Sequence, residues 1–232
     1  MGKKKGKKST FREYLESIII AVLLAFVIKT SIVEAYKIPT GSMEDTLLVG
    51  DFLLANKFIY GARLPLIGLK LPALQHPQPG QVVIFKYPLN RKTNYIKRVI
   101  ATAGQVVEIK DKRVYIDGKL VPEPPKSKHT DPREIPRGVN NRDNFGPVRV
   151  PKGYIFVMGD NRDNSYDSRF WGFLDMELIR GKGMIIHFSW EPDSNAPRLS
   201  WDNPLSAIHL FFYNLLHLPQ RIRWRRIGHL IR

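Results

Sequence analysis

The sequence of 232 residues contains no cysteine. Disulfide bonds, thiolate metal sites and a cysteine nucleophile are therefore excluded, and the redox state of the compartment stays open. The six histidines are dispersed instead of grouped at the spacings of metal ligands, so the sequence implies no metal site and no other cofactor. His76 and His129 fall in proline-rich segments and the others lie at or beyond position 187, which disfavours a Ser-His-Asp triad without excluding it.

Acidic residues are few compared with basic ones: 21 Asp and Glu against 37 Lys and Arg, a formal net charge of +16. A charge of this size is typical of proteins that bind nucleic acid or an anionic membrane surface. Most of the excess lies in the two tails, whereas a nucleic-acid binder interleaves positive charge with aromatic residues on its β face. The sequence therefore favours membrane lipids as a partner and disfavours nucleic acid.

Long apolar runs are also rare, and the clearest one occupies residues 18–28, with a weaker extension beyond it. Residues 18–35 would form a helix of about 27 Å, close to the roughly 30 Å of a membrane core. The lysines between residues 3 and 8 would hold the N-terminus in the cytoplasm. We therefore predict a cytoplasmic tail (1–16), a transmembrane helix (17–36) and a main domain on the periplasmic face of the inner cell membrane. A cleaved signal peptide is the alternative, although no clear small-x-small site follows the run.

The main domain, residues 37–190, is predicted to be all-β. Short runs of β-branched and aromatic residues are typical of strands. They occupy residues 82–87, 95–101, 106–110, 113–116, 154–158 and 184–190. Asp117-Gly118 predicts a tight hairpin. Many of the 17 Pro and 17 Gly separate these runs, which predicts a coiled β-barrel or sandwich-like domain with loops or insertions at 64–80 and 122–147.

Ser42 lies between a glycine and a methionine in the segment IPTGSMEDTLLVGD, residues 38–51, just after the apolar run. Pro39 restricts the backbone there, Gly41 permits close approach and Met43 offers an apolar contact. Such a segment is by itself typical of an extended turn before a strand. A catalytic role for the Ser42 hydroxyl requires a base elsewhere in the chain.

The candidate base is Lys97 in the segment NYIKRVIA. Strand alternation places Lys97 and Arg98 on opposite faces, so one of these basic residues shares a face with apolar neighbours. If Lys97 is the buried one, loss of hydration disfavours its ammonium form and lowers its pKa from about 10.4. A neutral lysine amine can accept the proton of a serine hydroxyl without histidine. An exposed strand lysine that packs only its stem is the alternative.

The segment YIFVMGDNRDNSYDSRFWGFL, residues 154–174, begins as a strand and breaks at Gly159 into a polar loop. Nine of the ten residues at 160–169 are charged, amide or aliphatic hydroxyl residues, which is more than a turn needs. Asp167 and Arg169 are suited to a charge-assisted pair that would hold this loop rigid. Its hydroxyls could then orient a buried amine.

Three segments, PTGSMEDTLLVGD, YIKRVIATAGQ and MGDNRDNSYDSRFWGF, follow the apolar run in this order. In this arrangement the chain resembles bacterial type I signal peptidase, or leader peptidase, a family of membrane-bound Ser-Lys proteases. The resemblance covers roughly residues 17–190. It implies a serine endopeptidase in which Ser42 is the nucleophile and Lys97 the general base.

The resemblance also implies roles for residues near these two. Thr40 would supply one oxyanion donor by its side chain, and Ser42 the other by its backbone N–H. Ser165 would orient the lysine, while Asp167 and Arg169 would brace the polar loop.

The implied activity is removal of N-terminal signal peptides from exported preproteins, after small residues in an Ala-x-Ala pattern, through an acyl-enzyme. Ile38, Pro39, Met43 and Ile96 would shape shallow apolar pockets for those small side chains. An extended substrate would pair with an exposed strand edge. One position departs from the family, which often carries Pro three residues after the nucleophile, in S-M-x-P-T-L, where this chain has Asp45.

The C-terminal tail, residues 191–232, is predicted to contain a basic amphipathic helix. Apolar residues recur at helical spacing at 205, 208, 212, 215 and 216, and Trp224 follows with Arg221, Arg223, Arg225, Arg226 and Arg232. Such a pattern is typical of a helix that lies on an anionic lipid surface. A helix packed on the β domain is the alternative, and a second membrane span is disfavoured because the apolar run at 205–218 is short.

Two other classes of protein remain open. A membrane-anchored β-domain binding module would explain the charge and the strands without any catalysis. A Ser-Lys self-cleaving repressor would share the chemistry but should begin with a helix-turn-helix, where this chain has an apolar run.

Overall fold

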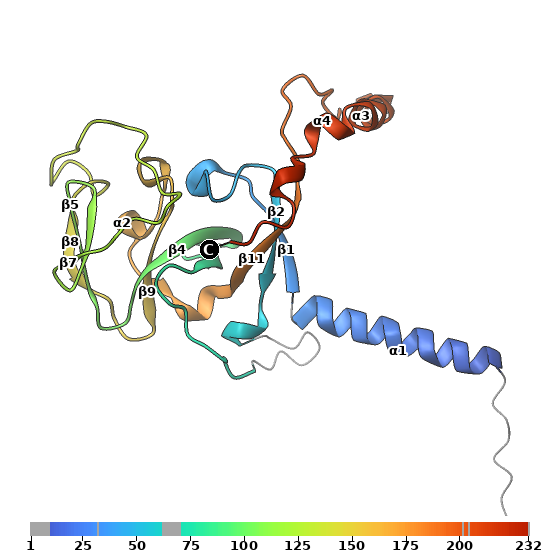
Figure 1. The fold of residues 1–232 in the computed structure, drawn as a ribbon, viewed down its shortest axis with the longest axis horizontal. Helices are drawn as coiled ribbons and strands as arrows, with labels where there is room; N and C mark the ends of the chain where they lie inside the picture. Colours follow the sequence, from blue (N-terminus) through green and yellow to red (C-terminus); the bar gives the residue numbers. More distant parts are fainter. Residues whose placement is uncertain (1–9, 32, 62–70, 201, 204, 232) are drawn as a thin grey trace, which may run out of the picture.

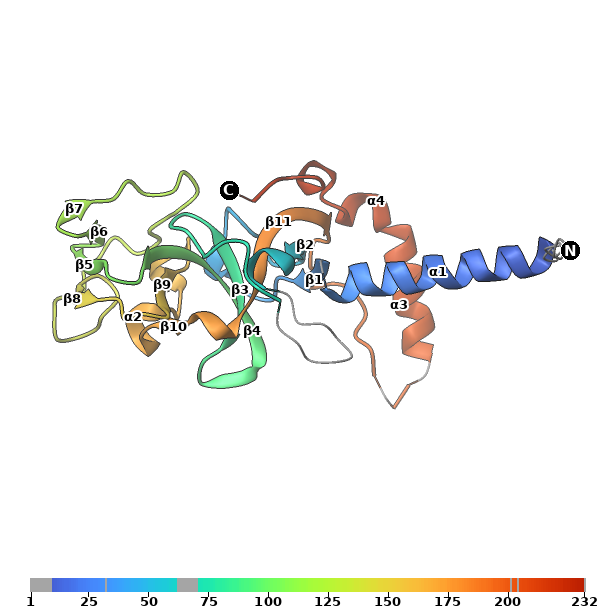
Figure 2. The ribbon, with the colours of Figure 1, turned by 90° about the horizontal axis from the view of Figure 1, so that it is seen from below.

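The structure is a computed structural model that describes residues 10–31, 33–61, 71–200, 202–203 and 205–231. Figure 1 shows a β body from which helix α1 (Thr10–Ser31) projects at one end. Helices α3 (Leu205–Leu216) and α4 (Leu218–Arg221) lie toward the same end, and the short helix α2 (Ser168–Trp171) lies toward the other (Figure 2).

The strands in the described part of the chain form two antiparallel sheets. The larger has the order β1-β2-β11-β3-β4-β9-β10 and the smaller the order β7-β6-β5-β8. Their bounds are β1 (Val33–Lys37), β2 (Asp51–Asn56), β3 (Val82–Tyr87), β4 (Asn90–Thr102), β5 (Val106–Lys110), β6 (Arg113–Ile116), β7 (Lys119–Leu120), β8 (Phe145–Arg149), β9 (Tyr154–Met158), β10 (Leu174–Asp175) and β11 (Ile179–Ser189). The prediction of a mostly β fold is confirmed.

Strands form where apolar residues alternate or run together. Strands β3, β5, β6 and β9 have the predicted bounds. Asp117 and Gly118 make the turn between β6 and β7, with the positive φ angles of 51° and 76° that a tight hairpin needs. Strands β4 and β11 begin earlier than predicted, at residues 90 and 179, because residues there that do not continue the apolar pattern pair with β3 through their backbones.

The two predicted loops are largely irregular. Residues 121–144 contain no helix or strand, and the end of the predicted insertion at 122–147 forms β8, which pairs with β5. Of the predicted loop at 64–80, residues 71–80 are irregular and the others lie outside the described residues.

The segment that carries Ser42 is anchored at both ends. Ile38 N donates to Asp51 O at 2.8 Å, and Gly50 N donates to Ile38 O at 3.1 Å, which closes the segment into a loop. Met43 and Leu47 are buried in the core between β1, β2 and β11. Burying apolar side chains of this size stabilises the fold by about 1.5–3 kcal/mol each. The loop is therefore held by backbone pairing and by its own core residues.

Helix α1 differs from the predicted range 17–36. It ends at Ser31, and the residues after it form strand β1, which pairs with β2 and turns Tyr36 into the core. The predicted helix is therefore wrong at both ends: the helix begins at Thr10, inside the predicted tail 1–16, and residues 33–36 form a strand because they find a sheet partner. The lysines between residues 3 and 8 lie outside the described residues. Among the residues described, no helix is both long and apolar enough to cross a membrane, so the single-pass span stays a prediction.

The C-terminal tail divides into two parts near Pro219. Helix α3 exposes apolar side chains and contains no Lys or Arg. After α4 the chain returns to the β body, with isolated bridges from Ile222 to Trp190 and from Leu230 to Ile185. The predicted basic end of one amphipathic helix is therefore wrong. Arg221 ends α4, and Arg223, Arg225 and Arg226 belong to the segment after it, because Pro219 cannot continue the hydrogen bonds of α3 and the β body offers other partners. Arg232 lies outside the described residues.

Candidate active site

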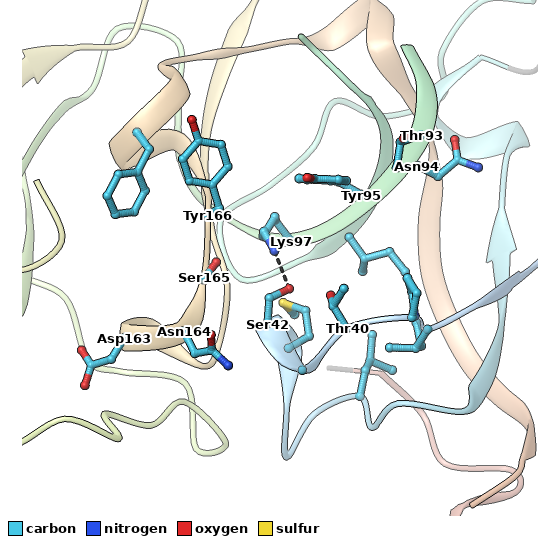
Figure 3. A pocket seen from close by; sticks show the side chains of 17 residues that line it. Thr40, Ser42, Thr93, Asn94, Tyr95, Lys97, Asp163, Asn164, Ser165 and Tyr166 are labelled. Carbon is cyan, nitrogen blue, oxygen red and sulfur yellow. Dashed lines mark hydrogen bonds between the residues drawn. The ribbon is translucent and has the colours of Figure 1, made fainter. Parts of the chain in front are cut away.

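Ser42 lies on the short 3-10 turn η1 (Gly41–Met43). Its carbonyl oxygen accepts a hydrogen bond from Asn161 N in the polar loop, at 3.1 Å, and Gly41 O accepts from Glu44 N at 3.0 Å. These contacts fix the backbone on both sides of Ser42. The Ser42 side chain lines a cavity, together with residues from β4 and the polar loop (Figure 3).

Lys97 Nζ lies 2.5 Å from Ser42 Oγ, although 55 positions separate the two residues in the sequence (Figure 3). Lys97 belongs to β4, where it pairs with Val83 of β3, and only 3% of it is exposed. Arg98, on the other face of the strand, is equally buried. Alternation left open which of the two basic residues is buried. In the structure both Lys97 and Arg98 are buried, and Lys97 is the one that contacts Ser42.

Burial is the main reason why the pKa of Lys97 falls from 10.5 to about 8. Asp167 and Asp160 raise the pKa of Lys97 through their charges, and Arg169 lowers it. With a pKa near 8, about one amine in ten is neutral at pH 7 and about half are neutral at pH 8. The site therefore holds a usable base near neutral pH, in contact with a hydroxyl.

A buried ion pair braces the polar loop. Arg169 Nε donates to Asp167 Oδ1 at 2.9 Å, and Arg169 Nη2 donates to Asp167 Oδ2 at 2.8 Å. Asp167 also caps α2 and accepts from Gly159 N at 3.0 Å. Burial opposes ionisation of Asp167, but Arg169 and the hydrogen bonds outweigh it and hold the pKa of Asp167 below its usual value. One carboxylate thus fixes both ends of the loop.

Ser165 lines the same cavity as Lys97 and Ser42 (Figure 3). Its hydroxyl is buried and makes no well-formed hydrogen bond to any described residue, although it is near enough to Asp167 to lower the pKa of that carboxyl. A Cβ at Gly159 would lie 2.3 Å from Ser165 Oγ and 2.4 Å from Ser42 O, so only glycine permits this close approach. In the sequence Gly159 marked only the end of a strand.

A second buried ion pair joins the three motifs, and sequence reasoning missed it. Arg98 Nε and Nη2 donate to the two carboxylate oxygens of Asp160 at 2.7 and 2.6 Å. Thr46 Oγ1 donates to Asp160 Oδ2 at 2.6 Å. Residues from β4, from the polar loop and from the segment after Ser42 therefore meet at one carboxylate. Alternation placed Arg98 behind Lys97, but only the strand register shows what Arg98 contacts.

The cavity beside Ser42 has a volume of about 600 Å³. The predicted pocket residues and the predicted oxyanion donor all line it: Ile38, Pro39, Thr40, Met43 and Ile96. Figure 3 shows Thr40 and Ser165 on opposite sides of Ser42. Sequence reasoning did not identify the aromatic side chains that line the rest of the cavity, which are Tyr95, Tyr166 and Phe170.

Asp45, the position that departs from the S-M-x-P-T-L pattern, has a backbone φ of 72°. Proline is locked near −65° and cannot adopt this conformation, whereas aspartate visits it more readily than most residues. The carboxylates of Asp45 and Glu44 lie 3.1 and 3.2 Å from Lys128 Nζ. The turn after Ser42 therefore has its own backbone geometry and is tied to the insertion at 122–147.

Within the described ranges, no group of three or more His, Asp and Glu side chains could hold a metal ion. A buried lysine amine in contact with a serine hydroxyl, beside an apolar cavity on a β body, is the arrangement of a serine hydrolase that uses lysine in place of histidine. A family model described as signal peptidase, peptidase S26, matches residues 11–188. The chain belongs to this family of serine endopeptidases, which confirms the resemblance seen in the sequence.

Three relatives show the extent of the similarity. The chain is 38% identical to signal peptidase I of Pseudomonas aeruginosa, over 85% of this chain and 80% of that protein. It is 34% identical to signal peptidase I of Aquifex aeolicus, over 91% of this chain and 97% of that protein. It is 41% identical to signal peptidase I T of Bacillus subtilis, over 79% of this chain and 89% of that protein.

Proposed function

We propose that this protein removes N-terminal signal peptides from exported preproteins, with Ser42 as the nucleophile and Lys97 as the general base. The observation that carries the proposal is the 2.5 Å contact between the buried Lys97 amine and the Ser42 hydroxyl. Burial lowers the pKa of that amine to about 8, so a neutral base is present at physiological pH. A binding module without catalysis would have no use for this arrangement.

Acylation begins when the neutral Lys97 amine accepts the Ser42 proton and Ser42 Oγ attacks the scissile carbonyl carbon. The Thr40 hydroxyl and the Ser42 backbone N–H stabilise the resulting oxyanion, and loss of one such donor costs about 2.7–4 kcal/mol in another serine protease. The protonated Lys97 then donates its proton to the leaving amine as the peptide bond breaks. The products are an acyl-enzyme on Ser42 and the new N-terminus of the mature protein.

Deacylation uses the same groups in reverse. The Lys97 amine accepts a proton from a water molecule, which attacks the ester carbonyl, and Ser42 recovers its proton as the signal peptide leaves. The buried Ser165 hydroxyl would accept a hydrogen bond from the Lys97 amine and direct its lone pair at Ser42. Asp167 and Arg169 act indirectly, because they fix the loop that carries Ser165.

The substrate would bind along a free strand edge. Between residues 90 and 97, strand β4 pairs with β3 on one side and with no other strand of the described residues, because its pairing with β9 begins at Arg98. Residues 93–95 of this edge line the cavity. An extended preprotein segment would add to the edge by backbone hydrogen bonds, facing residues 38–42 across the cavity. The shallow apolar lining would then accept the small side chains of an Ala-x-Ala site.

Membrane placement is part of the proposal. Helix α1 would anchor the chain with its N-terminus in the cytoplasm and the β body on the outer face of the inner membrane. Helix α3 projects from the same end of the β body as α1 (Figures 1 and 2). Its exposed apolar side chains suit the headgroup region of an anionic lipid surface. They are Leu205, Ile208, Phe211, Phe212, Leu215 and Leu216.

A topology experiment tests the membrane placement. A C-terminal tag on the full chain should be digested by protease added outside spheroplasts, because α3 would rest on the outer surface and not cross the bilayer. Replacing Phe211 and Phe212 together by serine should weaken binding to vesicles of anionic lipid once α1 has been cleaved off. A protected tag would show that α3 spans the membrane, and unchanged binding would contradict the lipid contact.

The catalytic assignment is tested with Ser42→Ala and Lys97→Ala in the full chain. Both variants should stop preprotein processing and lose labelling of Ser42 by a penem-type serine acylator, while they still fractionate with membranes. Lys119→Ala is the matched control, because Lys119 is an exposed strand lysine of the smaller sheet. Full preprotein processing by Ser42→Ala or Lys97→Ala would refute the proposal. If the protein were a binding module without catalysis, the acylator would not label even the parent protein.

A further inference from the structure

Residues 222–231, here called the C-terminal strap, run back from α4 along strand β11. Gly228 N donates to Ile186 O at 2.8 Å, and Ile186 N donates to His229 O at 3.0 Å, so the strap pairs with the strand through its backbone. The strap lies outside residues 11–188, the part of the chain that the family model matches.

The strap places Arg226 on Asp51, an aspartate that is fully buried. Arg226 Nη2 donates to Asp51 Oδ2 at 2.5 Å, and Arg226 Nε lies 3.1 Å from both carboxylate oxygens. Ser189 Oγ and Leu48 N donate to the same carboxylate at 2.6 and 2.8 Å. Burial opposes ionisation of Asp51, but these partners hold its pKa below the usual value. The strap thus supplies the guanidinium group of Arg226, which contacts both oxygens of the buried Asp51 carboxylate.

Two arginines of the strap also hold the backbone that follows Ser42. Arg226 Nη2 donates to Thr46 O at 3.1 Å as well as to the carboxylate. Arg223 Nη2 donates to Val49 O at 2.6 Å. The two residues of each pair are far apart in the sequence, by 180 positions for Arg226 and Thr46 and by 174 for Arg223 and Val49. The contacts are therefore a property of the fold and not of local chain geometry.

The held segment, residues 46–51, is connected directly to the nucleophile. Leu47 N donates to Met43 O at 2.7 Å, which closes one turn of chain immediately after Ser42. Met43 and Leu47 also share one core cluster, so they move together. A displacement of residues 46–51 would therefore change the position of Ser42 Oγ relative to Lys97 Nζ.

We propose that Arg226 is a positioning residue for catalysis: through Asp51 and the Thr46 carbonyl, it fixes the turn that presents Ser42 to Lys97. The inference rests on the proposed function, because Ser42 is the nucleophile of that reaction. A merely structural Arg226 would affect the stability of the protein and leave the chemical step of the folded molecules unchanged.

The test uses the full chain in detergent micelles. Arg226→Met removes the bidentate contact, Arg226→Lys restores a cation, and Arg225→Met is the matched control because Arg225 is the exposed neighbour. Rates of Ser42 acylation by a penem-type serine acylator are measured together with kcat and KM for a signal-peptide substrate.

In Arg226→Met the acylation rate and kcat should fall on the order of 10²-fold, the effect of a misplacement of about 1 Å. KM should stay within about twofold, because substrate contacts are untouched. The acidic limb of the pH profile should not move, because the surroundings of Lys97 are unchanged. Arg226→Lys should lie between the parent and Arg226→Met, and Arg225→Met should match the parent.

Two further measurements separate the possible outcomes. Amide hydrogen exchange in residues 43–50 should quicken in Arg226→Met even if the protein is not a peptidase, so this readout is independent of the proposed function. If Arg226→Met does not fold, Asp51→Asn/Arg226→Met removes the buried charge with its partner and should fold with slow acylation. Parental acylation in either folded variant, or unchanged exchange in residues 43–50, overturns the inference.

Discussion

Replacing Lys97 by methionine should give an inactive protein that is more stable than the parent at neutral pH. Burial lowers the pKa of Lys97 from 10.5 to about 8 in the folded protein. The difference, 10.5 − 8 = 2.5, corresponds to about 3 kcal/mol of unfolding free energy. Below pH 8 the native state therefore holds an ammonium group that destabilises it by about this amount.

The pH dependence of this effect has a definite sign. Below pH 8 both states carry the proton and the whole penalty applies, whereas between pH 8 and 10.5 the unfolded state binds more protons and the stability of the parent rises with pH. Above pH 10.5 the penalty is gone. Methionine carries no charge but loses the contact with Ser42, which contributes about 0.5–1.5 kcal/mol. The variant should thus gain about 2 kcal/mol at pH 7 and lose this advantage by pH 10.5.

Denaturant unfolding of the full chain in micelles, at pH 7 and at pH 10, measures the effect. Lys119→Met controls for the loss of a lysine at an exposed position. The same titration should appear in the parent as an acylation rate that rises with pH with a midpoint near pH 8, because only the neutral amine accepts the proton. The reasoning is refuted if Lys97→Met is no more stable than the parent at pH 7, or if its advantage is equally large at pH 10.

Three other changes have defined outcomes. Thr40→Val should lower kcat about 10²- to 10³-fold at unchanged KM, with Thr40→Ser close to the parent in steady-state kinetics. Gly159→Ala should destabilise the protein by about 1–3 kcal/mol and stop acylation, because its Cβ would lie 2.4 Å from Ser42 O; unfolding and labelling measured together check this. Asp45→Asn should change the unfolding free energy by less than about 1 kcal/mol, since it loses only an exposed ion pair. Asp45→Pro should destabilise more, because proline cannot adopt a φ of 72°, and equal stability of the two variants would contradict this reading.

The sequence predicts a strand well where side-chain burial leaves a pattern, as in β3 and β9. Strand β8 was not predicted, because the segment FGPVR contains glycine and proline and becomes a strand only through its pairing with β5. Local sequence places most of strand β1 in a membrane helix, because VEAYK follows directly on an apolar run. Its partner β2, which decides the matter, cannot be recognised from local sequence.

The sequence predicts those residues of the candidate site whose side-chain chemistry and motif are visible locally. Ser42 and Lys97 were identified from the motifs, and alternation showed that Lys97 or Arg98 must be buried. That both are buried depends on residues distant in the sequence, because Ser42 contacts Lys97 on one face of β4 and Asp160 contacts Arg98 on the other. The contact of Arg98 with Asp160 joins residues 62 positions apart, and that of Arg226 with Thr46 joins residues 180 positions apart. No local pattern encodes such contacts.

Three of the fully buried aspartates pair with arginines in or beside the segments that carry Ser42, Lys97 and Ser165: Asp160 with Arg98, Asp167 with Arg169, and Asp51 with Arg226. A buried ion pair contributes little net stability compared with apolar packing, because desolvation of the two charges offsets their attraction. Bidentate contacts do fix the relative orientation of two segments in a directional way. The first pair joins β4 to the polar loop, and the third joins the turn after Ser42 to the C-terminal strap. The second orients the Asp167 carboxylate, which accepts a hydrogen bond from Gly159 N at the other end of the loop. All three pairs therefore orient segments that meet where Ser42 Oγ and Lys97 Nζ lie 2.5 Å apart, and we attribute them to this orientation and not to stability.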